Sequence, residues 1–349
     1  MWAARLATSN HNSMARVYII AEAGVNHNGS VDLALQLVEA AKDGGADAVK
    51  FQTFRADRIA TRSAVKAHYQ KRQTGDAESH FKMLQRLELN VEAHRRIMDH
   101  CRQIGIEFLS SPFDEESVDL LDALGVSQFK VPSGEVTNLP LLQHIAGKNR
   151  PVILSTGMST LGEVEEAVLA LHAAGTASIT LLHCVTEYPA PYGEINLRAM
   201  QTLRAAFGLP VGYSDHSEGI EIAIAAVAMG AQVIEKHFTI DRSLPGPDHA
   251  ASLEPAELKQ MVSAIRNVEL ALGNGIKVPA PCEIPNISVA RKSLIAAHTL
   301  PAGHRLRTED LTIKRPGTGI SPKFLQVLVG HTLQTSVKED EVIHWNDLA

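Results

Sequence analysis

The sequence predicts an α/β protein in which a parallel (β/α)8 barrel is followed by a smaller C-terminal module. From Val17 onward, short runs rich in Val, Ile and Phe alternate with longer stretches of helical periodicity. Eight such strand-then-helix units fit into roughly 250 residues, which favours a closed barrel over an open doubly wound sheet. The periodicity stops at a Gly/Pro-rich linker, 273–285, so we expect a separate module over 286–349.

Each candidate strand is a short apolar run bounded by polar or turn residues. In chain order the candidates are 17–22, 47–52, 106–111, 127–132, 151–156, 178–184, 210–215 and 232–237. Between them, runs such as 31–46 and 161–175 carry apolar residues at i, i+3 and i+4, and a glycine near the end of each can serve as a C-cap. These units define a barrel domain over 17–272.

The connection after the second strand, 53–105, is too long for one simple crossover. It holds a polar loop around 67–79, with the sequence AHYQKRQTGDAES, before a helical stretch. An insertion at the active face of a barrel commonly covers or shapes a pocket, so we expect this loop to lie near the site.

The two ends of the chain differ from the barrel. The segment 1–16 is small and polar without an apolar core, so it is expected to be a disordered extension and not a secretory signal. The segment 286–349 has short apolar pieces, turn signals and one helix-like run near 321–330, which indicates a mixed or mainly β module. A core built from so few residues would be marginal, so this module is expected to dock against something else.

Charge and cysteine usage exclude several classes of function. The 33 Lys and Arg against 39 Asp and Glu give a net charge of -6, which argues against general binding of nucleic acid or anionic membrane. No run approaches the ~18 to 20 apolar residues of a membrane helix. Cys101, Cys184 and Cys282 form no C-x-x-C pair, so neither a disulfide framework nor a cysteine zinc site is indicated. A cytoplasmic location is the simplest expectation.

Polar residues gather where the candidate strands end. In a barrel these positions converge on one mouth, where α/β barrels carry out their chemistry. The residues at these ends are Glu22, Lys50, Gln52, Ser110, Ser111, Lys130, Ser133, Glu135, Ser155, Thr156, His183, His216 and His237. No P-loop, G-x-G-x-x-G, H-E-x-x-H or G-x-S-x-G element argues for another chemistry.

The lysines are the most informative of these residues. A single serine after a strand is more often a helix cap than a ligand contact, and a lone lysine in a strand usually lies on an edge or a solvated face. Lys50 and Lys130, however, lie within apolar strands that a closed barrel buries, and an unpaired buried ammonium is costly. With the nearby hydroxyls they predict a pocket for a phosphate plus a carboxylate.

The two histidines suggest a metal site. His216 and His237 end successive strands, so their imidazoles should emerge at the same edge of the sheet. Taken alone, such a pair would more often be core histidines. Glu22 and Asp248 are expected near the same mouth, and together with the histidines they favour a site for a divalent metal with open coordination positions for substrate. The spacing of these residues does not distinguish between zinc, manganese and magnesium.

Eleven motifs, in family order, resemble those of the bacterial sialic acid synthases. They are IAEAGVNHNG, AVKFQTF, LSSPFD, FKVPSGE, ILSTGM, LLHCVTEYPAPY, GYSDHSEG, IEKHFTID, GPDHAASLEP, ARKSL and KRPGTGI, from about residue 17 to the C-terminus. The resemblance implies a barrel followed by an antifreeze-like (SAF) domain, in a domain-swapped homodimer. It also implies condensation of phosphoenolpyruvate with an N-acetylated mannose-type sugar, which yields a nine-carbon sialic acid and phosphate.

The resemblance also implies roles for individual residues. Metal ligation falls on His216 and His237, and acid/base chemistry on Glu22 and Glu135, with Glu135 favoured for activating water. The phosphoenolpyruvate contacts fall on Lys50, Ser111, Lys130, Ser133, Ser155 and Ser214. The sugar contacts fall on Gln52, Tyr188, Asp248 and, from the partner chain, Arg315. Ser111 and Thr186 depart from some members, which have threonine and asparagine there, and this affects substrate detail more than reaction type.

Three functions follow, in order of preference. The first is a metal-dependent N-acetylneuraminate synthase that uses N-acetylmannosamine, with Mn²⁺ expected and Mg²⁺ or Co²⁺ as alternatives. The second is an N,N'-diacetyllegionaminate synthase that uses 2,4-diacetamido-2,4,6-trideoxymannose. The third, a non-catalytic sugar- or ice-binding protein, is suggested only by the small C-terminal module and would not need buried lysines or paired histidines at strand ends.

Overall fold

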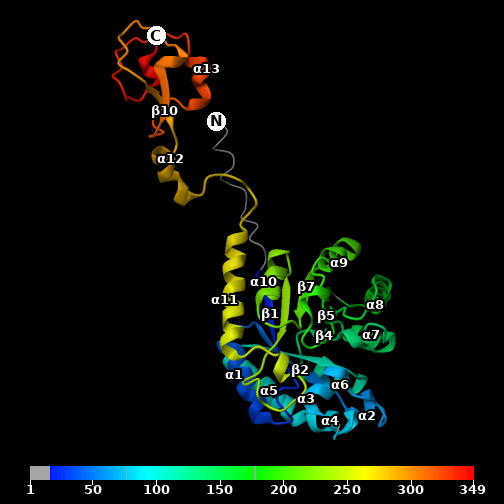
Figure 1. The fold of residues 1–349 in the computed structure, drawn as a ribbon. Helices are drawn as coiled ribbons and strands as arrows, with labels where there is room; N and C mark the ends of the chain where they lie inside the picture. The colour runs from blue at the N-terminus through cyan, green and yellow to red at the C-terminus, as the bar shows by residue number, and fades with distance from the viewer. Residues whose placement is uncertain (1–15, 76, 177) are drawn as a thin grey trace. The chain divides into compact units, whose positions relative to one another are not determined.

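The chain forms two compact units, one that ends at Asn274 and one that begins at Gly275. The computed structural model describes residues 16–75, 77–176 and 178–349, and Figure 1 shows both units. The disordered extension expected over 1–16 lies, except for Arg16, outside the described residues. Among the described residues, no helix combines the length and apolarity needed to cross a bilayer.

Eight parallel strands form the barrel of the first unit. They are β1 Tyr18–Gly24, β2 Ala48–Thr53, β3 Glu107–Pro112, β4 Phe129–Val131, β5 Val152–Ser155, β6 Ile179–His183, β7 Val211–Asp215 and β8 Val233–His237. The hydrogen-bonded order is β3-β2-β1-β8-β7-β6-β5-β4, so β1 pairs with β8 and the sheet is nearly closed on itself. The predicted (β/α)8 barrel is therefore confirmed, and each candidate strand corresponds to one of these strands.

Helices follow the strands and cover the outside of the barrel (Figure 1). They are α1 Val31–Asp43, α5 Val91–Ile104, α6 Glu115–Leu124, α7 Leu139–Ala146, α8 Leu161–Ala173, α9 Ala199–Phe207, α10 Glu221–Ala228 and α11 Pro255–Leu272. Several begin at a polar N-cap whose side chain accepts a backbone N–H, as at Asn90, Asp114 and Thr160. Their apolar faces pack with the outer face of the sheet into one continuous core.

The insertion between β2 and α5 is more helical than the sequence indicated. It contains α2 Ala56–Ile59, α3 His68–Thr74 and α4 His80–Leu87. The expected polar loop at 67–79 is thus partly the helix α3, which has no buried residue and so lacks the apolar periodicity that would have revealed it. Met83 and Leu87 of α4 join Val25 and Phe54 in a small separate apolar cluster.

The inner face of the barrel changes from apolar to polar along the strands. Near the start of the strands it is filled by Ile20, Ala48, Leu109, Ile153, Leu182 and Val233. Side chains two residues apart share a face of a strand. Two residues further on, the same face therefore carries Glu22, Lys50, Ser111, Ser155, Cys184 and Glu235. The fold thereby brings charged groups to the carboxyl ends of the strands, next to the apolar layer that fills the rest of the barrel interior.

The second unit is small and has its own core. It contains α12 Ile284–Ala290, an antiparallel pair formed by β9 Ser293–Ala296 and β10 Leu311–Lys314, and the short helix α13 Leu325–Leu328. Its core residues are Leu294, Ala296, Leu300, Leu306, Ile320, Leu328, Leu333, Val337 and Ile343. The mixed character expected from the turn-rich sequence is present.

Candidate active site

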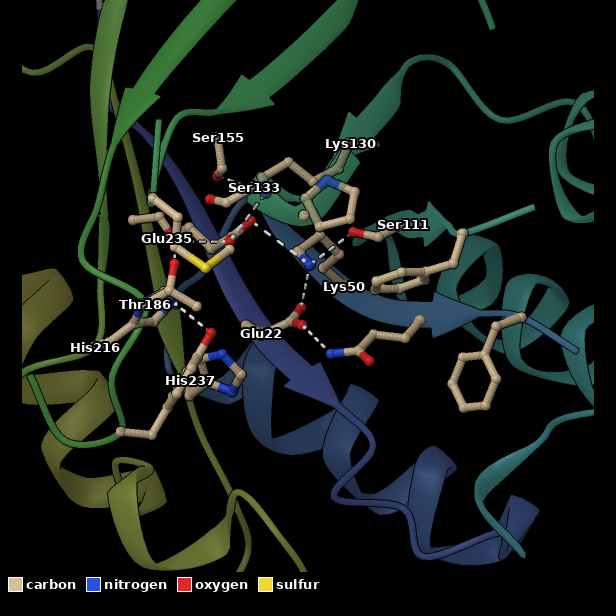
Figure 2. A pocket seen from close by; sticks show the side chains of 18 of the residues that line it. Glu22, Lys50, Ser111, Lys130, Ser133, Ser155, Thr186, His216, Glu235 and His237 are labelled. Carbon is tan, nitrogen blue, oxygen red and sulfur yellow. Dashed lines mark hydrogen bonds and ion pairs between the residues drawn. The ribbon is translucent and has the colours of Figure 1, made fainter. Parts of the chain in front are cut away.

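A cavity of about 340 Å³ opens at the carboxyl ends of the barrel strands. Figure 2 shows charged and polar side chains from most of the strands converging there. The lining includes the predicted residues Glu22, Lys50, Gln52, Ser111, Lys130, Ser133, Ser155, Tyr188, Ser214, His216 and His237. The structure thus brings together most of the residues that the sequence singled out from separate strands.

Lys50 and Lys130 lie at the base of the cavity, and their side chains are only 4% and 2% exposed. The Nζ atom of Lys50 lies 2.8 Å from the Glu22 carboxylate and donates to the Ser111 hydroxyl at 3.0 Å. The Nζ atom of Lys130 donates to the Ser155 hydroxyl at 2.8 Å. Each buried ammonium therefore lies beside a hydroxyl, as expected for a pair of groups that bind an anion.

Glu235 lies between the two lysines (Figure 2). Its carboxylate is 3.4 Å from Lys130 and 3.7 Å from Lys50, and it accepts a hydrogen bond from Ser214 at 2.9 Å. Burial alone would raise the pKa of Glu235, but Lys130 and Lys50 outweigh burial and lower it to about 2. Glu235 is therefore a fixed negative charge.

Glu22 differs from Glu235 in its protonation. Burial raises the pKa of Glu22 to about 7, against the opposing effect of Lys50 and with a further increase from Glu235. A carboxyl group with a pKa near 7 can exchange a proton at physiological pH. When Glu22 is protonated, the two lysines face only one carboxylate, which leaves the base of the cavity with a net positive charge that suits an anionic ligand.

The two histidines face each other on one side of the cavity, with ring centroids 5.4 Å apart. The Nδ1 atom of His216 donates to the backbone carbonyl of Val185 at 2.6 Å. The other ring nitrogen, Nε2, therefore carries no proton and is an acceptor in the cavity lining. Burial lowers the pKa of His216 to about 4 and lowers that of His237 as well, so both rings are neutral. Neutral imidazole is the form that binds metals.

These residues fit a divalent metal with open coordination positions. His237 has a buried Nδ1 atom without a hydrogen-bond partner among the described residues, which is costly unless a ligand meets it. No group of three or more His, Cys, Asp or Glu able to hold a metal occurs in the described part of the chain. Two protein ligands would leave the remaining positions to water and substrate oxygens.

A buried ion pair outside the barrel lumen connects the strands that carry the histidines. Lys236 donates to Asp215 at 2.9 Å, and both side chains are almost fully buried. Asp215 in turn accepts from the backbone N–H and hydroxyl of Ser217. Asp215 and Ser217 flank His216, and Lys236 precedes His237. This network therefore holds the ends of β7 and β8 in place from the side of the sheet that faces away from the lumen.

Among the proposed sugar contacts, Tyr188 lies closest to the histidines. Its ring centroid is 4.3 Å from that of His216 and 5.3 Å from that of His237. Gln52 donates to Glu22 at 3.4 Å. Asp248 is buried beside the site but does not line the cavity, and burial raises its pKa to about 6. Arg315 belongs to the second unit, where its Nε atom donates to the carbonyl of Ala290.

Glu135 does not line the cavity. It ends the short 3-10 helix Ser133–Glu135, and its carboxylate accepts a hydrogen bond from the Asn138 side chain at 2.7 Å. Ser133, at the start of the same turn, does line the cavity and accepts from the backbone N–H of Gly157. Among the residues that the structure describes, the carboxylates that line the cavity are Glu22 and Glu235.

Sequence reasoning missed part of the site. Glu235 was overlooked although it precedes His237 by two residues in a strand and must share its face, a signal that the sequence contains. The side chains from the insertion had no such signal, because their approach to the cavity depends on tertiary packing. The insertion supplies Ile59, Tyr69, Gln70, His80 and Leu84 to the cavity lining.

Comparisons with known proteins agree with this fold. A model described as the NeuB family matches residues 37–277, and an SAF domain model matches residues 291–349. Among solved structures, the N-acetylneuraminic acid synthetase of Leptospira borgpetersenii is 35% identical with a TM-score of 0.68, covering 78% of this chain and 90% of that chain.

Two curated relatives illustrate the range of similarity. The N,N'-diacetyllegionaminic acid synthase of Campylobacter jejuni is 52% identical over 95% of this chain and 99% of its own. The N-acetylneuraminate-9-phosphate synthase of Mus musculus is 35% identical over 93% of this chain and 91% of its own. This chain therefore belongs to the NeuB family of phosphoenolpyruvate-condensing nonulosonate synthases, and it is an enzyme, not a non-catalytic sugar-binding protein.

Proposed function

We propose that this enzyme condenses phosphoenolpyruvate with 2,4-diacetamido-2,4,6-trideoxymannose to give N,N'-diacetyllegionaminate and phosphate. The observation that carries the choice of sugar is the difference in identity between relatives. Two proteins named N,N'-diacetyllegionaminic acid synthase are 52% and 48% identical to this chain, whereas an N-acetylneuraminate-9-phosphate synthase is 35% identical. From the sequence alone, N,N'-diacetyllegionaminate synthesis was the second choice, after N-acetylneuraminate synthesis. The higher identity to the legionaminic acid synthases now favours it over N-acetylneuraminate synthesis.

Phosphoenolpyruvate would bind over the two buried lysines. It carries a phosphate and a carboxylate, and Lys50 and Lys130 provide two almost fully buried ammonium groups at the base of the cavity. The hydroxyls of Ser111, Ser133, Ser155 and Ser214 would complete the contacts to its oxygens. The fixed charge of Glu235 would hold both lysines in place between turnovers.

The sugar would present its open-chain aldehyde to the histidine side of the cavity. His216 and His237 would hold a divalent metal, Mn²⁺ in our proposal with Mg²⁺ or Co²⁺ as alternatives, which when bound polarises a carbonyl oxygen as a Lewis acid. Tyr188, which packs on both histidines, would hold the sugar beside them. Gln52, Asp248 and Arg315 from the partner chain of a domain-swapped homodimer would contact the rest of the sugar.

The chemistry then requires one carbon–carbon bond, one water and one leaving group. The methylene carbon of phosphoenolpyruvate bonds to the aldehyde carbon of the sugar as the aldehyde C=O π bond breaks, and the aldehyde oxygen takes the proton of Glu22, whose protonated form leaves Lys50 available to phosphoenolpyruvate. C2 of the former enol becomes electron-poor, and the Glu22 carboxylate then accepts a proton from the water that adds at C2. We assign this role to Glu22 because it lines the cavity and Glu135 does not. The C2–O bond to phosphate breaks as the new C2 hydroxyl gives its proton to the departing phosphate and becomes the C2 carbonyl, and Lys50 and Lys130 stabilise that phosphate.

Parallel assays with two sugars test this function. Phosphate release is measured with Mn²⁺ and phosphoenolpyruvate, and kcat/KM is compared for 2,4-diacetamido-2,4,6-trideoxymannose and N-acetylmannosamine. We expect a higher kcat/KM with the diacetamido sugar. A higher value with N-acetylmannosamine would restore N-acetylneuraminate as the product, and sugar-independent phosphate release would contradict condensation altogether.

A further inference from the structure

The helix α3, His68–Thr74, extends across the mouth of the barrel. It belongs to the insertion that follows β2, yet it contacts the loop that follows β6. Arg72 donates to the Glu187 carboxylate at 3.0 Å, and the ring of Tyr69 lies 4.8 Å from that of Tyr188. In the strand order β2-β1-β8-β7-β6, these two loops start from strands four positions apart, which are on opposite sides of an eight-stranded barrel.

Tyr69 is the residue of α3 that meets the histidine side of the cavity. Tyr69 and Tyr188 both line the cavity. Tyr188 in turn packs on His216 and His237, so the four rings form one continuous wall that begins at the candidate metal ligands and ends at Tyr69. The carboxylate of Asp248 also lies near both tyrosines.

The chemistry of this wall suits an acetamido group. Its methyl and planar amide pack well on aromatic faces, which offer contact area at little cost in conformational entropy. In the proposed substrate, the carbon next to the aldehyde carries an acetamido group. With the aldehyde at the histidines, that group falls against Tyr188 and the neighbouring ring of Tyr69.

We propose that Tyr69 is a sugar-binding residue that packs on the acetamido group next to the reacting aldehyde, and that α3 forms the outer wall of the sugar subsite. This inference rests on the proposed function and adds to it a contact from the insertion. His80 of α4, whose Nδ1 atom is buried without a hydrogen-bond partner among the described residues, also lines the cavity, so the insertion contributes polar as well as aromatic groups to it.

The location of α3 makes Tyr69 suitable for mutation. The helix contains no fully buried residue, and its C-terminal end is held by Lys66, which donates to the Thr74 hydroxyl and the Gly75 carbonyl. Truncation of Tyr69 therefore removes a wall of the cavity without opening the main core. Tyr192 is a matched control, because it is an exposed tyrosine four residues after Tyr188 that donates to the Glu218 carbonyl and does not line the cavity.

Steady-state kinetics of three variants test the proposal. We expect Tyr69→Ala to raise the KM for the sugar about tenfold, the effect of losing an aromatic contact, with the KM for phosphoenolpyruvate changed less than about twofold. Tyr69→Phe keeps the ring and should retain most of the sugar affinity. Tyr192→Ala should behave as the wild type. An unchanged sugar KM in Tyr69→Ala, or an equal rise in both KM values, would overturn the proposal.

A binding measurement separates this inference from the proposed function. The alditol of the sugar lacks the aldehyde and cannot react, so it is titrated by calorimetry into protein saturated with Mn²⁺ and phosphoenolpyruvate. We expect about tenfold weaker binding to Tyr69→Ala than to the wild type, whether or not the wild type turns over. Equal binding would refute the role of Tyr69, whereas an inactive wild type with this difference in binding would refute only the proposed reaction.

Discussion

The ammonium of Lys50 lies 2.8 Å from the carboxylate of Glu22 at the base of the cavity. The same ammonium is the group that we expect to bind an anionic substrate. An ionised Glu22 therefore competes with that substrate for Lys50, whereas a protonated Glu22 releases the lysine. Because burial raises the pKa of Glu22 to about 7, this competition changes within the physiological pH range.

The competition predicts how phosphoenolpyruvate binding depends on pH. Glu22 is mostly protonated at pH 6 and about nine-tenths ionised at pH 8, so at pH 8 only about a tenth of the protein is free of the competing charge. We expect Glu22→Gln to bind phosphoenolpyruvate up to about tenfold more tightly than the wild type at pH 8 and about equally at pH 6, as measured by calorimetry. The comparison at each pH cancels the titration of the ligand itself. Equal affinities at both pH values would refute the competition.

Glu235 predicts a coupling between anion binding and stability. Glu235→Gln removes the charge that pairs with Lys50 and Lys130, and breaking a buried ion pair costs about 3–5 kcal/mol. We expect a lower Tm in this variant and a larger increase in Tm on addition of phosphate than in the wild type, because phosphate replaces the lost charge. The exposed Glu166→Gln serves as the control and should match the wild type.

The two histidines predict that turnover requires a metal and that activity lost on metal removal returns when metal is added. Treatment with a chelator should abolish turnover, and added Mn²⁺ should restore it in the wild type. In His237→Ala, we expect weaker Mn²⁺ binding by electron paramagnetic resonance and no recovery of activity, while phosphoenolpyruvate still stabilises the protein over the two lysines. Full activity of the chelated wild type would contradict metal dependence.

The strands and most of the anion-binding residues could be predicted from the sequence because both follow local rules. Alternation in a strand fixes which side chains face the lumen, and the buried lysines of β2 and β4 were evident as charges within apolar runs. The contribution of Tyr69 could not be predicted, because α3 is a polar helix whose place depends on contacts with a loop more than a hundred residues away. The position of Glu135 also depends on the turn after β4, which the sequence pattern did not specify.

Arg315 predicts a role for the second unit in turnover. If it contacts the sugar from the partner chain, Arg315→Ala should lower kcat/KM for the sugar about tenfold or more, as expected for loss of a hydrogen bond to a charged group. The mass of the variant in light scattering should equal that of the wild type, because Arg315 is an exposed residue outside the core of its unit. Unaltered kinetics in this variant would exclude the contact.

The central claim is a condensation in which the C2–O bond of phosphoenolpyruvate breaks. The most direct test uses phosphoenolpyruvate labelled with ¹⁸O at the bridging oxygen, together with the diacetamido sugar and Mn²⁺, and mass spectrometry of both products. We predict one nine-carbon acid for each phosphate, with the label in the phosphate. Label retained in the organic product, or phosphate formed without the nine-carbon acid, would contradict the mechanism.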